Sequence, residues 1–559
     1  MEARVKAPVV ARARALMFNA PMQIDSSRRV PFALPLAVAS CAAVFPLFAA
    51  VAPQDAATNT KPAVPAAAPA TTQDAKATES KAADAASDVE AALRKSVINI
   101  KVRQEARDPS TPWKRESPQE FGGSGVVIAP GKVLTNAHVV EQASEILLET
   151  NQTSLPIQAE LVGIDKTRDL ALLSTTDEAF IAAHPPIPVL EGLPKEGSRV
   201  VVMGYPLGGE QLSTTSGVIS RIEWSDIGMT GESGMRVQVD AAINFGNSGG
   251  PAFVDGKVAG LAFSGMDNSM ADNIAYLLAT EEVRRFLDEI EQGKVDGNTV
   301  IGIETQTLEN PALRTKLGAS ADVAGVVVID QKGGPLQAWD ILTKINGYSI
   351  DNKGQVTIEG DRKVAMDCAV GRFVPTAEKN TITVEYVREG KAATAEIPAF
   401  TRATRTIGSY PDGNYPYLVY GPLVFSPLHM DLLRSTGGWM FFGESPIAQF
   451  ITDERPSGGK QVVAVASPLL SHPVGRGYEV NPGQSVKSVN GKTFANFAEF
   501  VQLLNDLKDE YVVFEFNERG IERLVFKRAE IEAATEKIMD SNGIRRQCSK
   551  DVQGIWTKD

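Results

Sequence analysis

The run Gly-Asn-Ser-Gly-Gly-Pro at residues 246–251 constrains this chain more than any other part of its sequence. Glycines on both sides of Ser248 allow a sharp backbone turn on which neighbouring amide N–H groups converge. A serine on such a turn is a candidate nucleophile. The loop Gly246, Asn247 and Ser248 is a candidate oxyanion hole, with the N–H groups of Gly246 and Ser248 as the natural donors.

A glycine-flanked serine also occurs in the nucleophile elbow of α/β-hydrolases, where a helix follows the serine directly. Here Pro251 comes soon after the serine, and residues 252–263 form two short apolar runs about Asp255-Gly256. An Asp-Gly pair between such runs predicts a type I′ hairpin. The sequence therefore places Ser248 among strands, with no helix for an elbow to enter.

A general base for Ser248 must come from a small set of histidines. The chain has four, which are His138, His184, His429 and His472. His138 follows a predicted strand and the small residue Ala137. A lone histidine among apolar residues is often a buried structural residue. The later glycine-rich serine, at a separation typical of a β-barrel, favours the general base as the role of His138.

The third member of a catalytic triad is an acid that orients the base. Residues 165–173, Asp-Lys-Thr-Arg-Asp-Leu-Ala-Leu-Leu, offer two aspartates. Asp169 enters the apolar run directly, where its carboxylate is shielded and can fix the tautomer of His138. We therefore predict His138, Asp169 and Ser248 as catalytic residues, and we expect Asp165 to be a solvated turn residue.

Composition limits the other classes of protein. A length of 559 residues exceeds what one hydrophobic core usually supports, so several domains are expected. The 47 Gly, the 33 Pro and repeated short β-type runs predict a mainly β fold. A net charge of −12 argues against a nucleic-acid-binding surface. The three cysteines show no metal-ligand spacing, and we expect neither a metal nor a cofactor.

The N-terminal residues 1–52 look like an export signal or a membrane anchor. An apolar run over residues 30–52 follows a basic start and is long enough to stay in a membrane. Cys41 lies in a segment that resembles a lipoprotein acylation site, and an Arg-rich start also suits an organellar transit peptide. Residues 53–87, rich in Ala, Pro and Thr, predict a flexible linker. We expect the periplasm or cell envelope, with an organelle as the alternative.

The strand-rich region ends in a predicted helix from Thr280 to Gly293. Apolar residues within it recur at helical spacing, and a glycine stops it. The sequence therefore predicts a first globular domain over residues 88–294.

Beyond that helix, two Asn-Gly turns at 346–347 and 490–491 follow similar apolar segments. This weak repeat indicates two related modules, over residues 295–400 and 401–559. In the second module, Asn496 begins a capping-box pattern that predicts a helix with an apolar core face. The mixed polar stretch after residue 530 predicts no particular structure.

The segments around the three catalytic candidates together resemble the signatures of the HtrA/Deg family of serine proteases. They are residues 135–140 (TNAHVV), 169–173 (DLALL) and 240–251 (DAAINFGNSGGP). The resemblance implies a chymotrypsin-like double β-barrel followed by two PDZ-like α+β modules, the second divergent. It also implies homo-oligomers, trimers or larger.

The same resemblance implies that residues 300–304 form a PDZ carboxylate-binding loop. Ile301, Gly302 and Ile303 would then hold C-terminal peptides. Residues 112–115, 309–314 and 421–428 resemble the plant-type Deg branch in particular. Phe245 departs from this pattern, since many relatives have a basic or polar residue there.

The expected function is that of a serine endopeptidase acting on unfolded or damaged polypeptides in protein quality control. It is expected to be ATP-independent, because the sequence has no Walker-type phosphate loop. The alternative is a PDZ-containing chaperone or polypeptide-binding protein with minor or gated proteolysis. Residues near 263–265 and 275–277 are expected to line the substrate pocket. They include no acid, so we expect cleavage after small or medium aliphatic residues.

Overall fold

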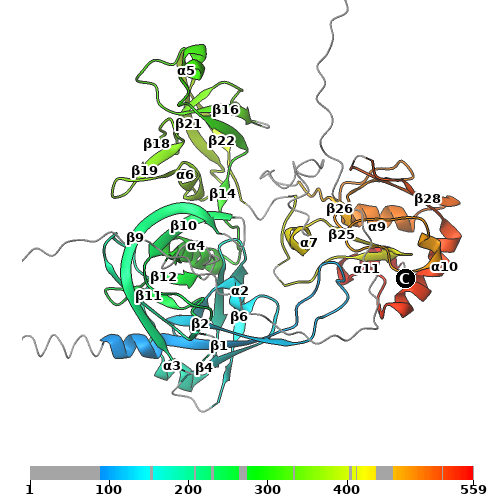
Figure 1. Ribbon diagram of the computed structural model, residues 1–559, viewed down its shortest axis with the longest axis horizontal. Coiled ribbons are helices and arrows are strands. Elements are labelled where there is room, and N and C mark those ends of the chain that lie inside the picture. Colours follow the sequence, from blue (N-terminus) through cyan, green and yellow to red (C-terminus); the bar gives the residue numbers. More distant parts are fainter. Residues whose placement is uncertain are drawn as a thin grey trace, which may run out of the picture. The chain divides into compact units, whose positions relative to one another are not determined.

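The computed structural model describes residues 89–557 except 151–154, 207–208, 210, 228–231, 264–273, 332–333, 402–405, 411, 436–457 and 519 (Figure 1). The expected signal or anchor, with Cys41, and the expected linker lie outside the described residues. Within the described ranges, no helix is both long and apolar enough to cross a bilayer.

A seven-stranded antiparallel sheet occupies the first part of the described chain. Its strands in spatial order are β5 (Ile157–Gln158), β4 (Ala143–Glu149), β1 (Val97–Gln104), β2 (Gln119–Ala129), β3 (Lys132–Thr135), β7 (Leu170–Ser174) and β6 (Glu160–Asp165). Successive side chains point to opposite faces of a strand. Val133 accordingly packs in one hydrophobic core and Leu134 in a second. The sheet is therefore buried on both faces at β3.

A closed six-stranded barrel follows. Its strands in spatial order are β10 (Glu232–Val239), β13 (Ala275–Ala279), β12 (Lys257–Phe263), β11 (Pro251–Val254), β8 (Arg199–Gly204) and β9 (Ser213–Ile227). Asp255 and Gly256, at φ of 50° and 74°, join β11 to β12, which confirms the predicted hairpin. Pro251 begins a strand directly after the serine loop, as predicted. Phe253 and Leu278 of this barrel share a core with Leu134 of the first sheet.

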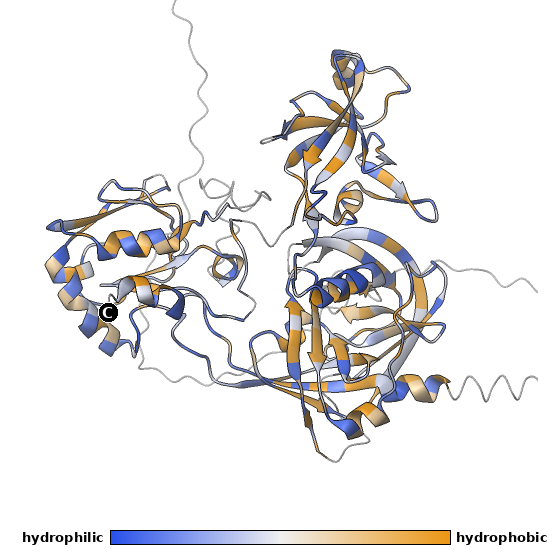
Figure 2. Ribbon diagram, turned by 180° about the vertical axis from the view of Figure 1, so that it is seen from behind, coloured by the Kyte–Doolittle hydropathy of each residue, from blue (hydrophilic) through white to orange (hydrophobic). Residues whose placement is uncertain are grey.

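The predicted helix is α4 (Thr280–Glu291). Its residues Val283 and Phe286 are buried in the core shared by the two β-structures. Its visible side in Figure 2 is mostly hydrophilic, as expected for an amphipathic surface helix. The helix ends before Gly293, whose φ of 70° is a conformation that favours glycine.

Two short helices also belong to this part of the chain. They are α2 (Ala137–Val140), between β3 and β4, and α3 (Glu178–Ala183), after β7. The one-turn helix α2 carries His138. The mainly β fold predicted from the sequence is confirmed.

Residues 299–401 form a second group of strands. They comprise a sheet of β15 (Ile303–Thr307), β16 (Val326–Gln331), β17 (Ile341–Ile345), β21 (Thr381–Arg388) and β22 (Lys391–Pro398), with β18 (Tyr348–Ser349) paired to β17, and the pairs β14 (Thr299–Val300) with β23 (Phe400–Thr401) and β19 (Gln355–Ile358) with β20 (Arg362–Ala365). Helices α5 (Pro311–Leu317) and α6 (Asp367–Gly371) complete the group. Asn346 and Gly347, at φ of 48° and 82°, form the predicted turn between β17 and β18.

The last group of elements has two three-stranded sheets and several helices. The sheets are β24 (Leu418–Tyr420), β25 (Leu423–Pro427) and β26 (Val463–Val465), and β27 (Val486–Val489), β28 (Tyr511–Phe516) and β29 (Leu524–Lys527). The helices are α7 (Met430–Ser435), the short 3-10 helix η5 (Pro473–Gly475), α9 (Phe497–Asn505), α10 (Arg528–Ser541) and α11 (Lys550–Trp556). The N-cap side chain of Asn496 accepts a hydrogen bond from the Glu499 amide at 2.9 Å, so the helix predicted from that cap is confirmed.

Candidate active site

His138 and Asp169 are held together by two hydrogen bonds. The His138 backbone N–H donates to Asp169 Oδ1 at 2.9 Å, and the ring Nδ1 lies 2.8 Å from Asp169 Oδ2. The side-chain amide of Asn136 also donates to the Asp169 carbonyl at 3.0 Å. Helix α2 thus presents both its backbone and its imidazole to one buried carboxylate. This pairing leaves Nε2 as the ring nitrogen available to a serine hydroxyl.

The serine loop packs against the residues that lead into α2. A Cβ on Gly249 would lie 2.2 Å from the Thr135 hydroxyl oxygen and 3.0 Å from the Asn136 nitrogen, so only glycine fits at this point. Ser248 itself is 6% exposed. The fold therefore brings Ser248 close to the start of α2, although no hydrogen bond joins Ser248 to His138 in the described part of the chain.

The loop amides differ in their availability to a ligand. Gly246 has a φ of 93°, the turn that only glycine adopts readily. The Asn247 N–H donates to the Asn244 carbonyl at 3.0 Å. The N–H of Asn247, a member of the predicted oxyanion loop, is thus already bonded within the protein. The N–H groups of Gly246 and Ser248 have no acceptor within the described residues.

Ser124 of β2 supports the loop and was missed by the sequence analysis. Its N–H donates to the Ser248 carbonyl at 2.9 Å, and its hydroxyl donates to the Gly246 carbonyl at 2.8 Å. The Tyr205 N–H donates in turn to the Ser124 hydroxyl at 2.8 Å. Ser124 thus ties both ends of the candidate oxyanion loop to the first sheet. In the sequence, the glycines around it at 122, 123 and 125 were the only sign of this supporting role.

Comparisons with known proteins show the family of this chain. Residues 123–261 match the family model of the trypsin-like peptidase domain, and residues 409–551 match that of the PDZ domain. Protease Do-like 2, chloroplastic, of Arabidopsis thaliana is 30% identical over 476 residues, covering 83% of this chain and 76% of the relative. The putative protease Do-like 3, mitochondrial, of the same plant is 28% identical, covering 79% and 77%.

The chain belongs to the HtrA/Deg family of serine proteases. It is a serine-type endopeptidase, and its plant relatives fit the plant-type Deg branch. Among solved structures, the HtrA-type protease AlgW with tripeptide is 24% identical, with a TM-score of 0.44, over 56% of this chain and 97% of that chain.

The PDZ match over residues 409–551 lies within the range predicted for the second module, residues 401–559. The matched models do not cover residues 295–400, so a first PDZ domain there stays a prediction. Of its expected peptide-binding residues, Ile301 has a buried side chain, Gly302 lies between β14 and β15, and Ile303 begins β15. Of the expected pocket residues, 264 and 265 lie outside the described residues.

Asp165, expected to be solvated, is buried instead. Its Oδ1 accepts hydrogen bonds from the Thr167 N–H at 2.8 Å, the Thr167 hydroxyl at 2.6 Å and the Arg168 N–H at 3.2 Å. The expectation was wrong because the carboxylate closes a tight turn and pairs with the buried guanidinium of Arg168. Asp169 remains the aspartate that contacts His138.

The electrostatic surroundings of His138 favour its charged form. Burial disfavours the charged ring, but the charge and hydrogen bond of Asp169 and the charge of Glu141 outweigh burial. The pKa of His138 is therefore raised above its ordinary value of 6.5. Glu141 directly follows α2 and pairs with Lys166.

This raised pKa predicts the pH dependence of cleavage. A general base must be neutral to accept a proton, so kcat/KM should fall as pH drops through the pKa of His138, at a pH above 6.5. The variant Glu141→Gln removes one of the charges that raise this pKa, and the acid limb should move to lower pH. Glu145→Gln, at an exposed position of β4, is the matched control. An acid limb that is identical in all three proteins would contradict the prediction.

Proposed function

We propose that this protease hydrolyses peptide bonds with Ser248 as nucleophile, His138 as general base and Asp169 as the acid that orients it. The proposal depends chiefly on the double contact between His138 and Asp169 beside a glycine-rich serine loop. Asp169 holds Nδ1, so the tautomer with a free Nε2 lone pair is the one that can deprotonate a serine. The free N–H groups of Gly246 and Ser248 are the proposed oxyanion donors.

In the proposed cycle, the Ser248 oxygen attacks the peptide carbonyl carbon while its proton moves to His138 Nε2. The carbonyl electron pair moves onto oxygen, where the two amides stabilise the negative charge. When this pair returns, the C–N bond breaks and His138 gives the proton to the leaving amine. A water molecule, deprotonated by the same histidine, then releases the acyl group and regenerates the serine.

For the substrate class we propose unfolded or damaged polypeptides, bound partly through their C-termini and cleaved without ATP. The matched PDZ domain supports this, because PDZ domains bind extended peptides by adding a strand to a sheet. We propose a cleavage preference for small or medium aliphatic residues and a homo-oligomeric assembly, trimeric or larger. A polypeptide-binding chaperone with gated proteolysis is the second candidate, supported by the size of the non-protease part.

For the compartment we propose an exported or organellar location. The relatives are named chloroplastic and mitochondrial in Arabidopsis thaliana, and a probable periplasmic serine endoprotease DegP-like occurs in Brucella suis. The basic and then apolar N-terminal sequence fits either route. The periplasm or cell envelope remains our specific proposal.

Covalent labelling tests the proposed chemistry. A fluorophosphonate probe reacts only with an activated serine, so peptide mapping should find its adduct on Ser248. The variant His138→Ala should lose this adduct while staying folded. Reduced and carboxymethylated α-lactalbumin should be cleaved without ATP, and the native folded form should resist. An adduct on another serine, or one unaffected by His138→Ala, would refute the triad.

A further inference from the structure

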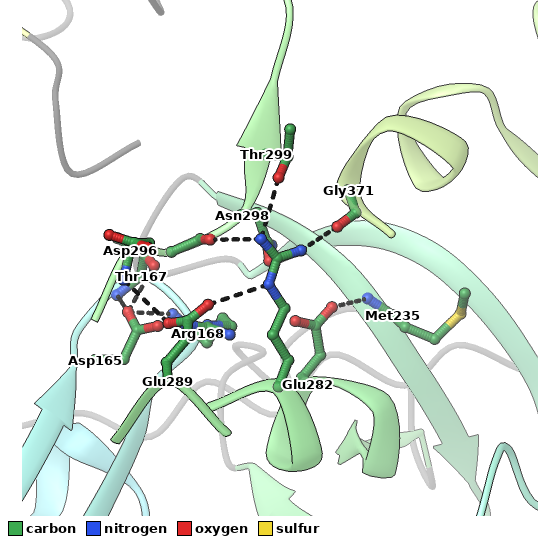
Figure 3. Close-up of polar contacts among 12 residues, drawn as sticks. Asp165, Thr167, Arg168, Met235, Glu282, Glu289, Asp296, Asn298, Thr299 and Gly371 are labelled. Atoms are coloured by element: carbon green, nitrogen blue, oxygen red, sulfur yellow. Dashed lines mark hydrogen bonds and ion pairs between the residues drawn. The ribbon is translucent and has the colours of Figure 1, made fainter. Parts of the chain in front are cut away.

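Arg168, the residue immediately before Asp169, is completely buried, with an exposed side-chain fraction of 0%. Its Nε donates to Asp165, and its Nη2 donates to Glu289 of α4 (Figure 3). Both carboxylates are also buried. An arginine in this position is costly to bury unless paired, and here each charge has a partner. The proposed chemistry gives this ion network no role.

Asp169 stands at a strained point of the backbone, with a φ of 57°. Left-handed backbone at a residue other than glycine persists only where the surroundings fix it from several sides. Two hydrogen bonds fix Asp169 itself: the His138 N–H donates to its carboxylate, and the Asn136 side chain donates to its carbonyl. The preceding residue, Arg168, anchors the chain in the interior through its buried ion pairs.

The carboxylate of Glu289, which pairs with Arg168, is itself held by further hydrogen bonds. Glu289 accepts hydrogen bonds from the Arg285 Nε at 3.2 Å and from the Asp296 N–H at 3.0 Å, besides that from Arg168. Arg285 Nη2 also donates a hydrogen bond to the Thr299 hydroxyl oxygen at 3.1 Å. The guanidinium of Arg168 therefore has one well-defined position between α4 and the turn. The charges of Asp165 and Glu289 outweigh burial and raise the pKa of Arg168, so the cation persists over any working pH.

We propose that Arg168 is a positioning residue for the catalytic triad. Its ion pairs with Asp165 and Glu289 hold the turn in the strained form that aims the Asp169 carboxylate at His138. Without this anchor, the backbone of Asp169 can relax to negative φ and carry the carboxylate away from the imidazole. The inference rests on the roles proposed above for His138, Asp169 and Ser248.

The test compares Arg168→Met with the double variant Arg168→Met/Glu289→Gln in the full chain. The double variant removes one of the two buried carboxylate charges that Arg168→Met leaves without the guanidinium. The other carboxylate, Asp165, keeps its hydrogen bonds from Thr167. With a short chromogenic peptide, kcat should fall about 100-fold, because small displacements of catalytic groups are costly. KM should stay unchanged, since the network lies in the interior.

A second readout follows His138 directly. Only four histidines are present, so the ring signals of isotope-labelled protein can be assigned with a His138→Gln variant. Asp169 and Glu141 are the charged groups that raise the pKa of His138. Loss of the Asp169 contact should lower the pKa of His138 relative to wild type. A network that only stabilises the fold would change the melting temperature but not this titration.

Two further variants serve as controls. Arg168→Lys keeps the charge but lacks the planar guanidinium that reaches two carboxylates. Its kcat should therefore lie between that of wild type and that of Arg168→Met. Arg388→Met breaks another arginine–aspartate pair, in which Nη2 of the partly exposed Arg388 lies 2.6 Å from buried Asp340 Oδ2, and kcat on the short peptide should not change.

The outcomes separate the two proposals. A folded double variant with wild-type kcat and an unshifted His138 titration would overturn the role of Arg168. Undiminished cleavage by Ser248→Ala would instead refute the proposed triad chemistry, and the His138 titration would still test whether Arg168 positions Asp169.

Discussion

Replacing Ser248 with alanine is expected to lower kcat about 10⁶-fold, as in other serine triads. The change removes the only oxygen that the proposed mechanism can join to the substrate carbonyl. It leaves the backbone N–H of residue 248 in place, and the Ser124 contacts to the loop are made by backbone carbonyls. The fold and substrate binding should therefore persist while turnover is lost.

The measurement is cleavage of unfolded α-lactalbumin over days, with purified protein at high concentration. Ser144→Ala is the matched control, because Ser144 lies at an exposed position of β4 where its hydroxyl donates to the Arg103 carbonyl at 2.9 Å, and activity should be unchanged. Substantial cleavage by Ser248→Ala would assign the nucleophile elsewhere. Suppression of aggregation by Ser248→Ala would show that polypeptide binding survives and would support the second candidate function.

Asp169→Asn is expected to lower kcat about 10⁴-fold with little effect on KM. Asparagine has nearly the same shape, so its carbonyl oxygen can still accept from the His138 N–H. Its amide, however, would donate to Nδ1 and hold the proton on Nε2, where the imidazole cannot accept the serine proton. The loss thus comes from the wrong tautomer in an intact site.

Steady-state kinetics with a short peptide, together with a thermal unfolding curve, test this expectation. Asp177→Asn is the control, since Asp177 caps α3 by accepting from the Phe180 N–H at 2.7 Å and asparagine caps equally well. An Asp169→Asn variant with wild-type kcat would remove Asp169 from the triad. A large loss of melting temperature would mean that the carboxylate is needed for folding as well.

Several elements could be predicted from the sequence because their signals are local. The Asp255-Gly256 hairpin follows from two residues that tolerate positive φ, and the helix after Asn496 follows from its cap. The periodicity of α4 likewise gave its position to within a turn. In each case, residues within a few positions of one another carry the whole signal.

Helix α10 shows where local reading failed. Ile531, Ala534 and Ile538 are buried at helical spacing, but the charged residues between them hide the apolar stripe. Ile531 packs in the same core as Leu418 and Phe514, which are far from it in the sequence. This helix is stabilised by the burial of these three apolar residues, and that burial cannot be read from the sequence.

The sequence by itself determined the three catalytic candidates, because glycines around a serine, a scarce histidine and an aspartate at the start of an apolar strand are each local patterns. Only the tertiary structure decided how they are held. Arg168 meets Glu289 across 121 positions of sequence, and Ser124 reaches Gly246 across 122. Such pairings depend on how two β-structures and α4 pack around shared cores. No local propensity encodes them, so the buried state of Asp165 and the occupied amide of Asn247 emerged only from the fold.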